Sequence, residues 1–106
     1  SASAEEESRR MKMLEYLILC SQSEEPPVFA GVITEARRIG LMVEATEIQQ
    51  KGLVKRGGFP KGNWRLEAHR EAYVAGKREL KLGQAIDLEV EKVDLERQMV
   101  DFRIVG

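Results

Sequence analysis

The chain has 106 residues, of which 42% are hydrophobic and 33% charged, and its formal net charge is -1. This length allows one domain with one modest core, which excludes a two-domain enzyme. The net charge hides an uneven distribution, because Lys/Arg and Asp/Glu number 3 and 7 in residues 1–36, 11 and 5 in residues 37–81, and 3 and 6 in residues 82–106. The middle block therefore carries a net charge of +6 (11 − 5) and is the candidate surface for an anionic partner.

The only cysteine, Cys20, cannot form an internal disulfide and has no activating neighbour, so we expect it to be structural. The longest apolar run, residues 17–20, is far shorter than the roughly 20 residues of a membrane-spanning helix, and the acidic start lacks the positive charge of a signal peptide. These features predict a soluble, cytoplasmic protein without a membrane partner. Because Ser1 is not preceded by an initiator Met, we also expect a fragment of a longer chain.

In chain order, the first predicted element is a helix over residues 4–19. Ser3 and Glu6 have the spacing of a capping box. Apolar residues recur three and four positions apart and form a stripe that needs covering: Met11, Met13, Leu14, Leu17 and Ile18. Pro26 and Pro27 cannot continue a helix, so residues 21–27 are expected to be a linker.

Five short strands are predicted after the linker, at residues 29–33, 40–43, 52–54, 82–90 and 100–104. The last two alternate apolar with charged residues, which predicts an antiparallel hairpin, and the wrong parity of Val93 predicts a bulge near Lys92. Gly31 and Gly40 permit the coiling that closes a small barrel. The expected fold is mainly β, a five-stranded antiparallel barrel preceded by one α-helix.

The segment between the third and fourth strands is harder to interpret. Three glycines and a proline predict a loop at residues 56–63, whereas residues 64–81 mix helical and strand signals and receive no assignment. Four apolar residues of this segment are expected to pack on the barrel: Leu66, Tyr73, Val74 and Leu80.

The order and spacing of these residues over about positions 28–105 resemble an S1 RNA-binding domain, which is an OB-fold module. The residues that carry the resemblance are Phe29, Gly31, Ile33, Thr34, residues 39–43 and 52–54, Leu82, Gly83, Ile86, Val90, Val93, Asp94 and residues 100–102. Leu82–Gly83 and Val100–Asp101–Phe102 are similar to the C-terminal S1 domain of ribonuclease II/ribonuclease R exonucleases. The N-terminal helix resembles the last helix of the catalytic domain that precedes the S1 domain in those enzymes.

This resemblance implies a division at residue 27, with residues 1–27 as the tail of an upstream catalytic domain and residues 28–106 as the RNA-binding domain. The implied parent degrades RNA from the 3′ end with a divalent metal, for which Mg²⁺ is the candidate. Its acidic catalytic cluster is expected upstream, so we expect this chain to have no catalytic residues, no metal site and no cofactor of its own. His69 has no partner at catalytic spacing.

S1 domains commonly carry aromatic or imidazole side chains on the second and third strands, where this chain has Ile39, Met42 and Lys55. Because none of these can stack a base as a ring would, binding should depend mainly on charge. The candidate RNA-binding residues are Arg37, Arg38, Met42, Lys51, Lys55, Arg56, Lys61, Trp64 and Arg65. The cations would neutralise phosphates, Met42 would form part of the sheet surface, and Trp64 is equally compatible with a stacking platform and with a lid on the core.

Two functions remain open. The first is a noncatalytic module that binds single-stranded RNA and feeds it to an exoribonuclease site in the upstream domain. The second is an S1-like barrel that binds protein, with the helix stripe marking the contact. The basic middle block favours the first, and the missing rings favour the second.

Overall fold

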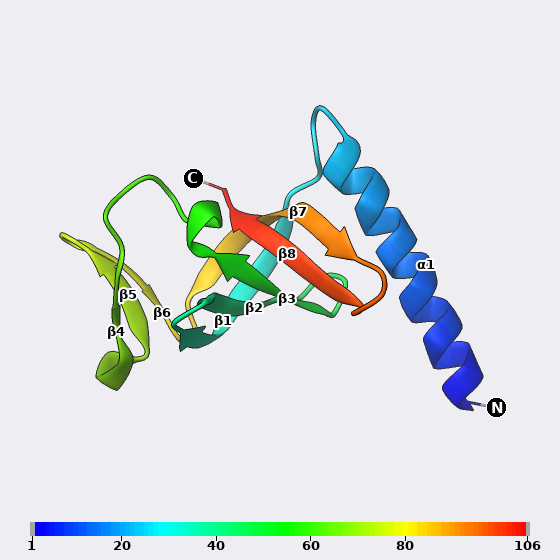
Figure 1. Ribbon diagram of the computed structural model, residues 1–106, viewed down its shortest axis with the longest axis horizontal. Helices are drawn as coiled ribbons and strands as arrows, with labels where there is room; N and C mark the ends of the chain where they lie inside the picture. The colour runs from blue at the N-terminus through cyan, green and yellow to red at the C-terminus, as the bar shows by residue number, and fades with distance from the viewer. Residues whose placement is uncertain (1, 106) are drawn as a thin grey trace.

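A computed structural model describes residues 2–105, with side chains from residue 9 onward. A single helix, α1 (Ala2–Gln22), is followed by eight strands in two sheets. The barrel strands are β1 (Phe29–Arg37), β2 (Gly40–Ala45), β3 (Gln50–Lys55), β7 (Ala85–Asp94) and β8 (Met99–Ile104). The small sheet contains β4 (Arg65–Glu67), β5 (Ala72–Ala75) and β6 (Arg78–Lys81). Of the two 3-10 helices in the described residues, η1 (Arg56–Gly58) follows β3 and contacts β3 and β8 of the barrel, and η2 (Ala68–Arg70) connects β4 to β5. Helix α1 and the small sheet lie on opposite sides of the barrel (Figure 1).

The barrel is closed in the order β1-β2-β3-β8-β7, which confirms the predicted five-stranded barrel. Four neighbouring pairs are antiparallel, including the predicted β7–β8 hairpin, and the expected bulge lies between Val90 and Lys92. The pair β3–β8 is instead parallel, with Leu53 opposite Asp101, so the expectation of an antiparallel barrel needs correction at this one pairing. The last strand therefore lies between β3 and β7.

Two glycines allow strands to approach where a side chain could not fit. Gly40 has a φ of +144°, and a Cβ on it would lie 2.1 Å from the carbonyl oxygen of Val54. At Gly52, where β3 passes β8, a Cβ would lie 2.5 Å from the Val100 carbonyl oxygen and 2.6 Å from the Phe102 ring. Both contacts would force a backbone or a buried ring to move, so barrel closure depends on these glycines.

Helix α1 packs on β7 and supplies part of the core. Leu14 and Leu17 are fully buried and belong to the same hydrophobic cluster as Phe102 of the barrel, so the centre of the apolar stripe predicted on the helix is covered within the chain, whereas Met11 remains 37% exposed. The helix is longer than the predicted residues 4–19, and the expected capping contact of Ser3 and Glu6 lies outside the described side chains. Among residues 2–105, no helix is both long enough and apolar enough to cross a membrane.

The small sheet occupies the segment that the sequence left unassigned. Leu66, Tyr73 and Leu80 are aligned across β4, β5 and β6, and they pack against the barrel core as predicted, with Tyr73 fully buried. Val74 lies at the opposite parity, beside Arg65, and lines a cleft, so its predicted packing on the barrel is wrong. The sheet is thereby fixed to the barrel by one face.

Candidate nucleic-acid interface

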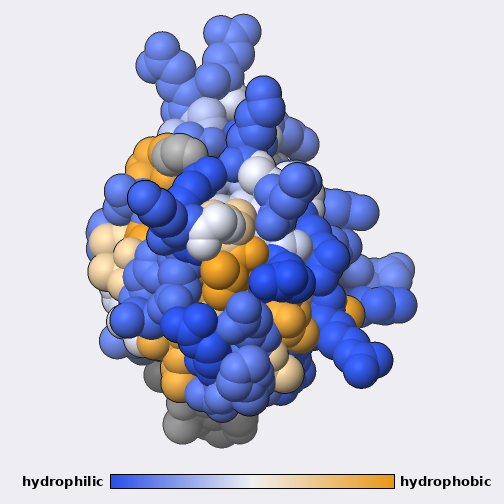
Figure 2. Space-filling view, turned by 90° about the vertical axis from the view of Figure 1, so that its left-hand side faces the viewer, coloured by the Kyte–Doolittle hydropathy of each residue, from blue (hydrophilic) through white to orange (hydrophobic). Residues whose placement is uncertain are grey.

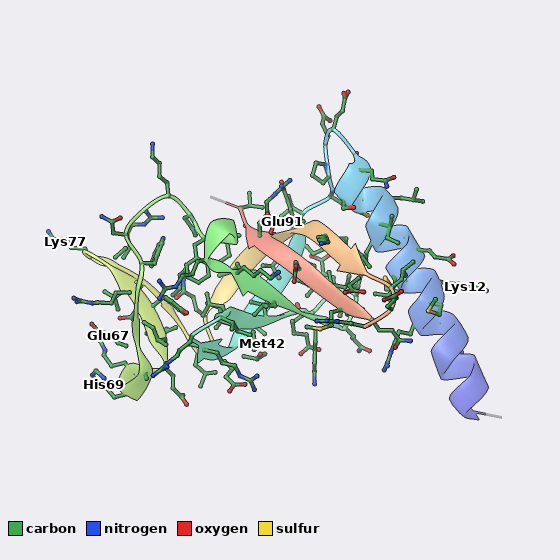
Figure 3. The ribbon with its side chains drawn as sticks, in the orientation of Figure 1. Lys12, Met42, Glu67, His69, Lys77 and Glu91 are labelled. Atoms are coloured by element: carbon green, nitrogen blue, oxygen red, sulfur yellow. The ribbon has the colours of Figure 1, made fainter. Side chains whose placement is uncertain are left out.

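The outer side of β2 and β3 carries three of the predicted site residues. Leu41, Val43 and Ala45 are buried in the barrel, so the alternate residue Met42 points outward (Figure 3). The β2–β3 register places Met42 opposite Leu53, and Lys51 and Lys55 two positions to either side of Leu53. We call the surface formed by Met42, Lys51, Leu53, Lys55 and Met99 the sheet face, in which Leu53 is only 5% exposed.

Lys55 is held at one end of the sheet face by a carboxylate. Its Nζ lies 3.3 Å from Oδ2 of Asp101, whose side chain is only 17% exposed. A cleft of about 360 Å³ surrounds this ion pair and is lined by Leu53, Lys55, Lys92, Asp94, Arg97, Met99 and Asp101. Besides Lys55, the cleft has two basic lining residues, Lys92 and Arg97. They come from the acidic C-terminal block and were not among the predicted site residues. An incoming phosphate would compete with Asp101 for Lys55.

A second cleft of about 410 Å³ lies at the Lys51 end of the sheet face. Its lining residues are Arg10, Met42, Gln49, Gln50, Lys51, Gly52, Gln98, Met99 and Val100. Arg10 reaches it from α1, where its guanidinium donates to the Gln98 side-chain oxygen at 3.4 Å. The helix thus adds a cation to a surface otherwise built by the barrel. This contribution could not be predicted from the charge distribution, because Arg10 belongs to the acidic N-terminal block.

The β1–β2 turn holds Arg37 and Arg38 in different ways. The Arg37 guanidinium lies 2.8 Å from Oε1 of Glu35, and this hydrogen bond lowers the pKa of Glu35 and raises the pKa of Arg37. Arg38 is exposed and forms no ion pair with any described side chain. Ile39 is 59% exposed in this turn, so it does not occupy the strand-face position that the S1 comparison suggested for it.

Three more predicted residues line a cleft of about 670 Å³ between the loop after η1 and the small sheet. The lining residues are Arg56, Phe59, Gly62, Asn63, Trp64, Arg65, Val74 and Gly76, and we call this the tryptophan cleft. Lys61 is exposed on the same loop. Figure 2 views this end of the molecule and shows small apolar patches among hydrophilic side chains.

The Trp64 ring is fixed on several sides. Its Nε1 donates to the Pro60 carbonyl at 2.6 Å, and its ring stands nearly perpendicular to the Phe59 ring, at an interplanar angle of 88° and a centroid distance of 6.1 Å. The Arg78 guanidinium carbon lies 5.0 Å from the ring centroid, and Nη1 of Arg78 donates to the Lys61 carbonyl at 2.6 Å. Trp64 is half-buried against the core and also lines the cleft, so it combines the two roles that the sequence left open. Arg78 was missed because its strand received no assignment.

Tyr73 connects the turn cations to the tryptophan cleft. Its hydroxyl donates to the carbonyl oxygen of Arg37, with the Arg38 carbonyl 3.3 Å away. The Arg56 guanidinium lies over its ring, and Gly40, which follows the turn, pairs with Lys55. Arg38, Lys55 and Arg56 are therefore held at one edge of the molecule, while Lys51 lies at the other end of β3.

Part of the basic block is neutralised within the small sheet. Arg65 lies 3.8 Å from Glu67, and Arg70 lies 3.2 Å from Glu67 and 3.0 Å from Glu79. These pairs are exposed, and each contributes little to stability. The predicted cations therefore divide into a group held by carboxylates, Arg37, Lys55 and Arg65, and a group without such a partner among the described side chains, Arg38, Lys51, Arg56 and Lys61.

No protein-family model and no curated protein matches the sequence. Several solved structures share its fold. The chain superposes on Mycoplasma genitalium RNase R in its apo form with a TM-score of 0.70 at 17% identity, covering 92% of this chain and 15% of that one. Against the same enzyme in complex with ribose methylated single-stranded RNA, the TM-score is 0.73 at 16% identity, covering 98% of this chain and 16% of that one.

An uncharacterized protein from Methanocaldococcus jannaschii is also similar, with a TM-score of 0.52 and 20% identity over 79% of this chain and 95% of that one. The expected likeness to a small domain of a ribonuclease R enzyme is thus confirmed at the level of the fold. The chain spans only about 15% of the length of the RNase R chains it matches.

Proposed function

We propose that this chain is a noncatalytic module that binds single-stranded RNA, mainly through its phosphates. The observation that carries the proposal is the grouping of Arg38, Lys55 and Arg56 at one exposed edge, where Tyr73 and the β2–β3 pairing hold their backbone in place. The likeness in fold to an RNase R structure that contains single-stranded RNA supports it.

The proposed contacts are electrostatic because the sheet face lacks rings. Met42 and Leu53 occupy its centre, and neither can stack a base as an aromatic side chain does. The cations proposed to contact phosphates are Arg37, Arg38, Lys51, Lys55, Arg56, Lys61 and Arg65. Phosphate contacts carry little sequence information, so this surface is expected to accept most single-stranded sequences.

The module is proposed to serve a longer parent protein. In this proposal the parent is a cytoplasmic 3′-to-5′ exoribonuclease that uses Mg²⁺ in an upstream catalytic domain, residues 1–27 are the tail of that domain, and residues 28–106 hold RNA and feed it to the active site. The packing of α1 on β7 would fix the module relative to the catalytic domain. The isolated chain is accordingly expected to leave RNA intact in the presence of Mg²⁺, and turnover by pure protein would contradict the proposal.

Fluorescence anisotropy of a labelled single-stranded RNA tests the proposal. If the seven cations each neutralise one phosphate, affinity should fall about 200-fold between roughly 50 and 150 mM salt, since each contact contributes about 0.7 to the logarithmic salt slope for single strands. A Kd that does not change with salt would contradict the phosphate contacts. Failure to bind RNA at the lower salt concentration would reject the proposed function.

The alternative function, protein binding through the helix stripe, loses its main support. Leu14 and Leu17 at the centre of the stripe are fully buried against the barrel. Met11, at one end of the stripe, is 37% exposed, and the other exposed apolar side chains of the described part of α1, Tyr16 and Leu19, lie outside the stripe.

A further inference from the structure

The tryptophan cleft has the size and lining of a site for a small planar ligand. Its volume of about 670 Å³ falls within the range of roughly 300 to 1,000 Å³ that is typical of such sites. Its lining includes Trp64, Arg56, Arg65 and Asn63. This combines an aromatic surface with two positive charges and one group that can both donate and accept hydrogen bonds.

One side of the Trp64 ring is already occupied. Trp64 lines both the tryptophan cleft and a neighbouring cleft that Arg78 and Pro60 also line, whereas Arg78 does not line the tryptophan cleft. The ring therefore forms the wall between the two clefts, with the Arg78 guanidinium on one side, 5.0 Å from its centroid. Since Arg78 does not line the tryptophan cleft, we assign the cleft to the side of the ring that lies away from Arg78.

The ring is also oriented before any ligand arrives. Its only hydrogen-bond donor is used by the Pro60 carbonyl, and Arg78 is itself tied to the Lys61 carbonyl, each at 2.6 Å. The indole can therefore offer a ligand only its π surface. A surface that is fixed in advance loses little conformational entropy on stacking, which favours affinity.

We propose that the tryptophan cleft holds one unstacked nucleobase of single-stranded RNA against the side of Trp64 that lies away from Arg78, with the adjacent phosphates on Arg56 and Arg65. This inference rests on the proposed function and adds to it a base-stacking subsite away from the sheet face. Arg78 is a positioning residue that supports the ring from behind. A base within a duplex is covered on both faces by its neighbours, so the subsite makes the module selective for single strands.

The chain contains one tryptophan, so its intrinsic tryptophan fluorescence reports on the surroundings of Trp64. The test titrates the full chain with an oligoadenylate of about 12 nucleotides, which matches the site size of related folds. Two controls of equal length are an abasic ribose-phosphate oligomer and the oligoadenylate annealed to its complement. The same samples, with an end label, are followed by anisotropy to measure binding independently of Trp64.

The oligoadenylate is expected to quench Trp64 and to give the same Kd by fluorescence and by anisotropy. The abasic oligomer retains the phosphates and should bind about 5-fold or more weakly without quenching, because stacking one base is worth about 1 to 3 kcal/mol. The duplex should likewise leave the Trp64 fluorescence unchanged.

Two substitutions test the assignment of residues. Trp64→Leu should weaken oligoadenylate binding about 5-fold or more while leaving abasic binding within about 2-fold, and Trp64→Phe should retain most of the affinity because it retains a ring. Arg65→Ala should weaken binding of both oligomers by removing a phosphate contact. Arg70→Ala is the matched control, since Arg70 is exposed beside the same sheet but does not line the cleft. Circular dichroism confirms that each variant is folded.

The possible outcomes separate the two proposals. Salt-dependent RNA binding with unchanged Trp64 fluorescence overturns the base subsite and leaves the proposed function standing. Equal quenching by the abasic oligomer and the oligoadenylate also overturns the subsite, because it requires no base. Absence of binding by anisotropy at low salt overturns both.

Discussion

The guanidinium carbon of Arg56 lies 5.4 Å from the centre of the Tyr73 ring. The edge of the same ring packs against Phe59, at a centroid distance of 4.8 Å, and its hydroxyl bonds to the β1–β2 turn. One fully buried side chain of the small sheet thus fixes both the turn that carries Arg38 and the loop that borders the tryptophan cleft. The small sheet positions the candidate interface as well as covering one end of the barrel.

Tyr73→Phe should lower the free energy of unfolding by about 0.5 to 1.5 kcal/mol, because it removes the hydroxyl that bonds to the turn while keeping the ring in the core. Urea unfolding followed by circular dichroism measures this change. Tyr16→Phe is the control, since Tyr16 is 45% exposed on α1 and its replacement should change stability by less than about 0.5 kcal/mol. Equal effects of the two substitutions would show that the Tyr73 hydroxyl does not stabilise the turn.

The double substitution Arg38→Glu with Lys55→Glu should weaken RNA binding and reduce the logarithmic salt slope by about 1.4, since two phosphate contacts of about 0.7 each are lost. Anisotropy over a series of salt concentrations gives the slope. Lys12→Glu with Lys77→Glu changes the net charge by the same amount at positions on α1 and beyond β5, at opposite ends of the molecule (Figure 3). If this control lowers the slope equally, the contacts do not lie on the predicted edge.

Asp101→Asn should tighten RNA binding about 2- to 5-fold at low salt. The substitution frees Lys55 from a carboxylate 3.3 Å away; Lys55 is 62% exposed, and an ion pair with one solvent-exposed partner is worth about 1 kcal/mol. The measurement is the Kd by anisotropy. Glu91→Gln, at an exposed position of β7, removes the same charge away from Lys55 and should change the Kd less than Asp101→Asn does. A larger Kd for Asp101→Asn than for the unchanged protein would mean that the carboxylate orients Lys55 for binding.

Gly52→Ala should destabilise the barrel by about 1 to 3 kcal/mol or prevent folding, because the added Cβ would overlap the Val100 carbonyl and the Phe102 ring. Gly57→Ala is the matched control, since no atom lies within 4 Å of a Cβ at that position. Thermal unfolding of the two variants compares them directly. Similar melting temperatures would show that β3 and β8 can separate without cost.

The barrel could be predicted from sequence because its longer strands alternate in burial. Ile86, Leu88 and Val90 show the period of two that identifies a half-buried strand, and the parity change at Val93 marks the bulge. The small sheet could not be predicted from the sequence, since β4, β5 and β6 contain only three or four residues each and are too short to show a period of alternating burial. Their stability comes from Tyr73 and Leu80 packing in the core, which is a tertiary effect.

The candidate site was predictable only in part. The charge distribution identified Arg38, Lys51 and Arg56 because they are close in sequence. Arg10, Lys92 and Arg78 were missed. Folding brings Arg10 and Lys92 to the clefts at the sheet face from acidic blocks, and it brings Arg78 to the Trp64 ring from an unassigned strand. The pairing of Lys55 with Asp101 was also hidden, because it depends on the parallel placement of β3 beside β8.

The parallel pairing of β3 with β8 determines when the barrel can close during synthesis of the chain. Strands β1, β2 and β3 are consecutive and can form their hairpins as they leave the ribosome, but their sheet stays open at β3 until β8 has been made. Pairing of β8 with β3 therefore closes the barrel, and the same pairing brings Asp101 next to Lys55. A nascent chain that lacks β8 would expose the inner side of β3 and leave Lys55 without its carboxylate.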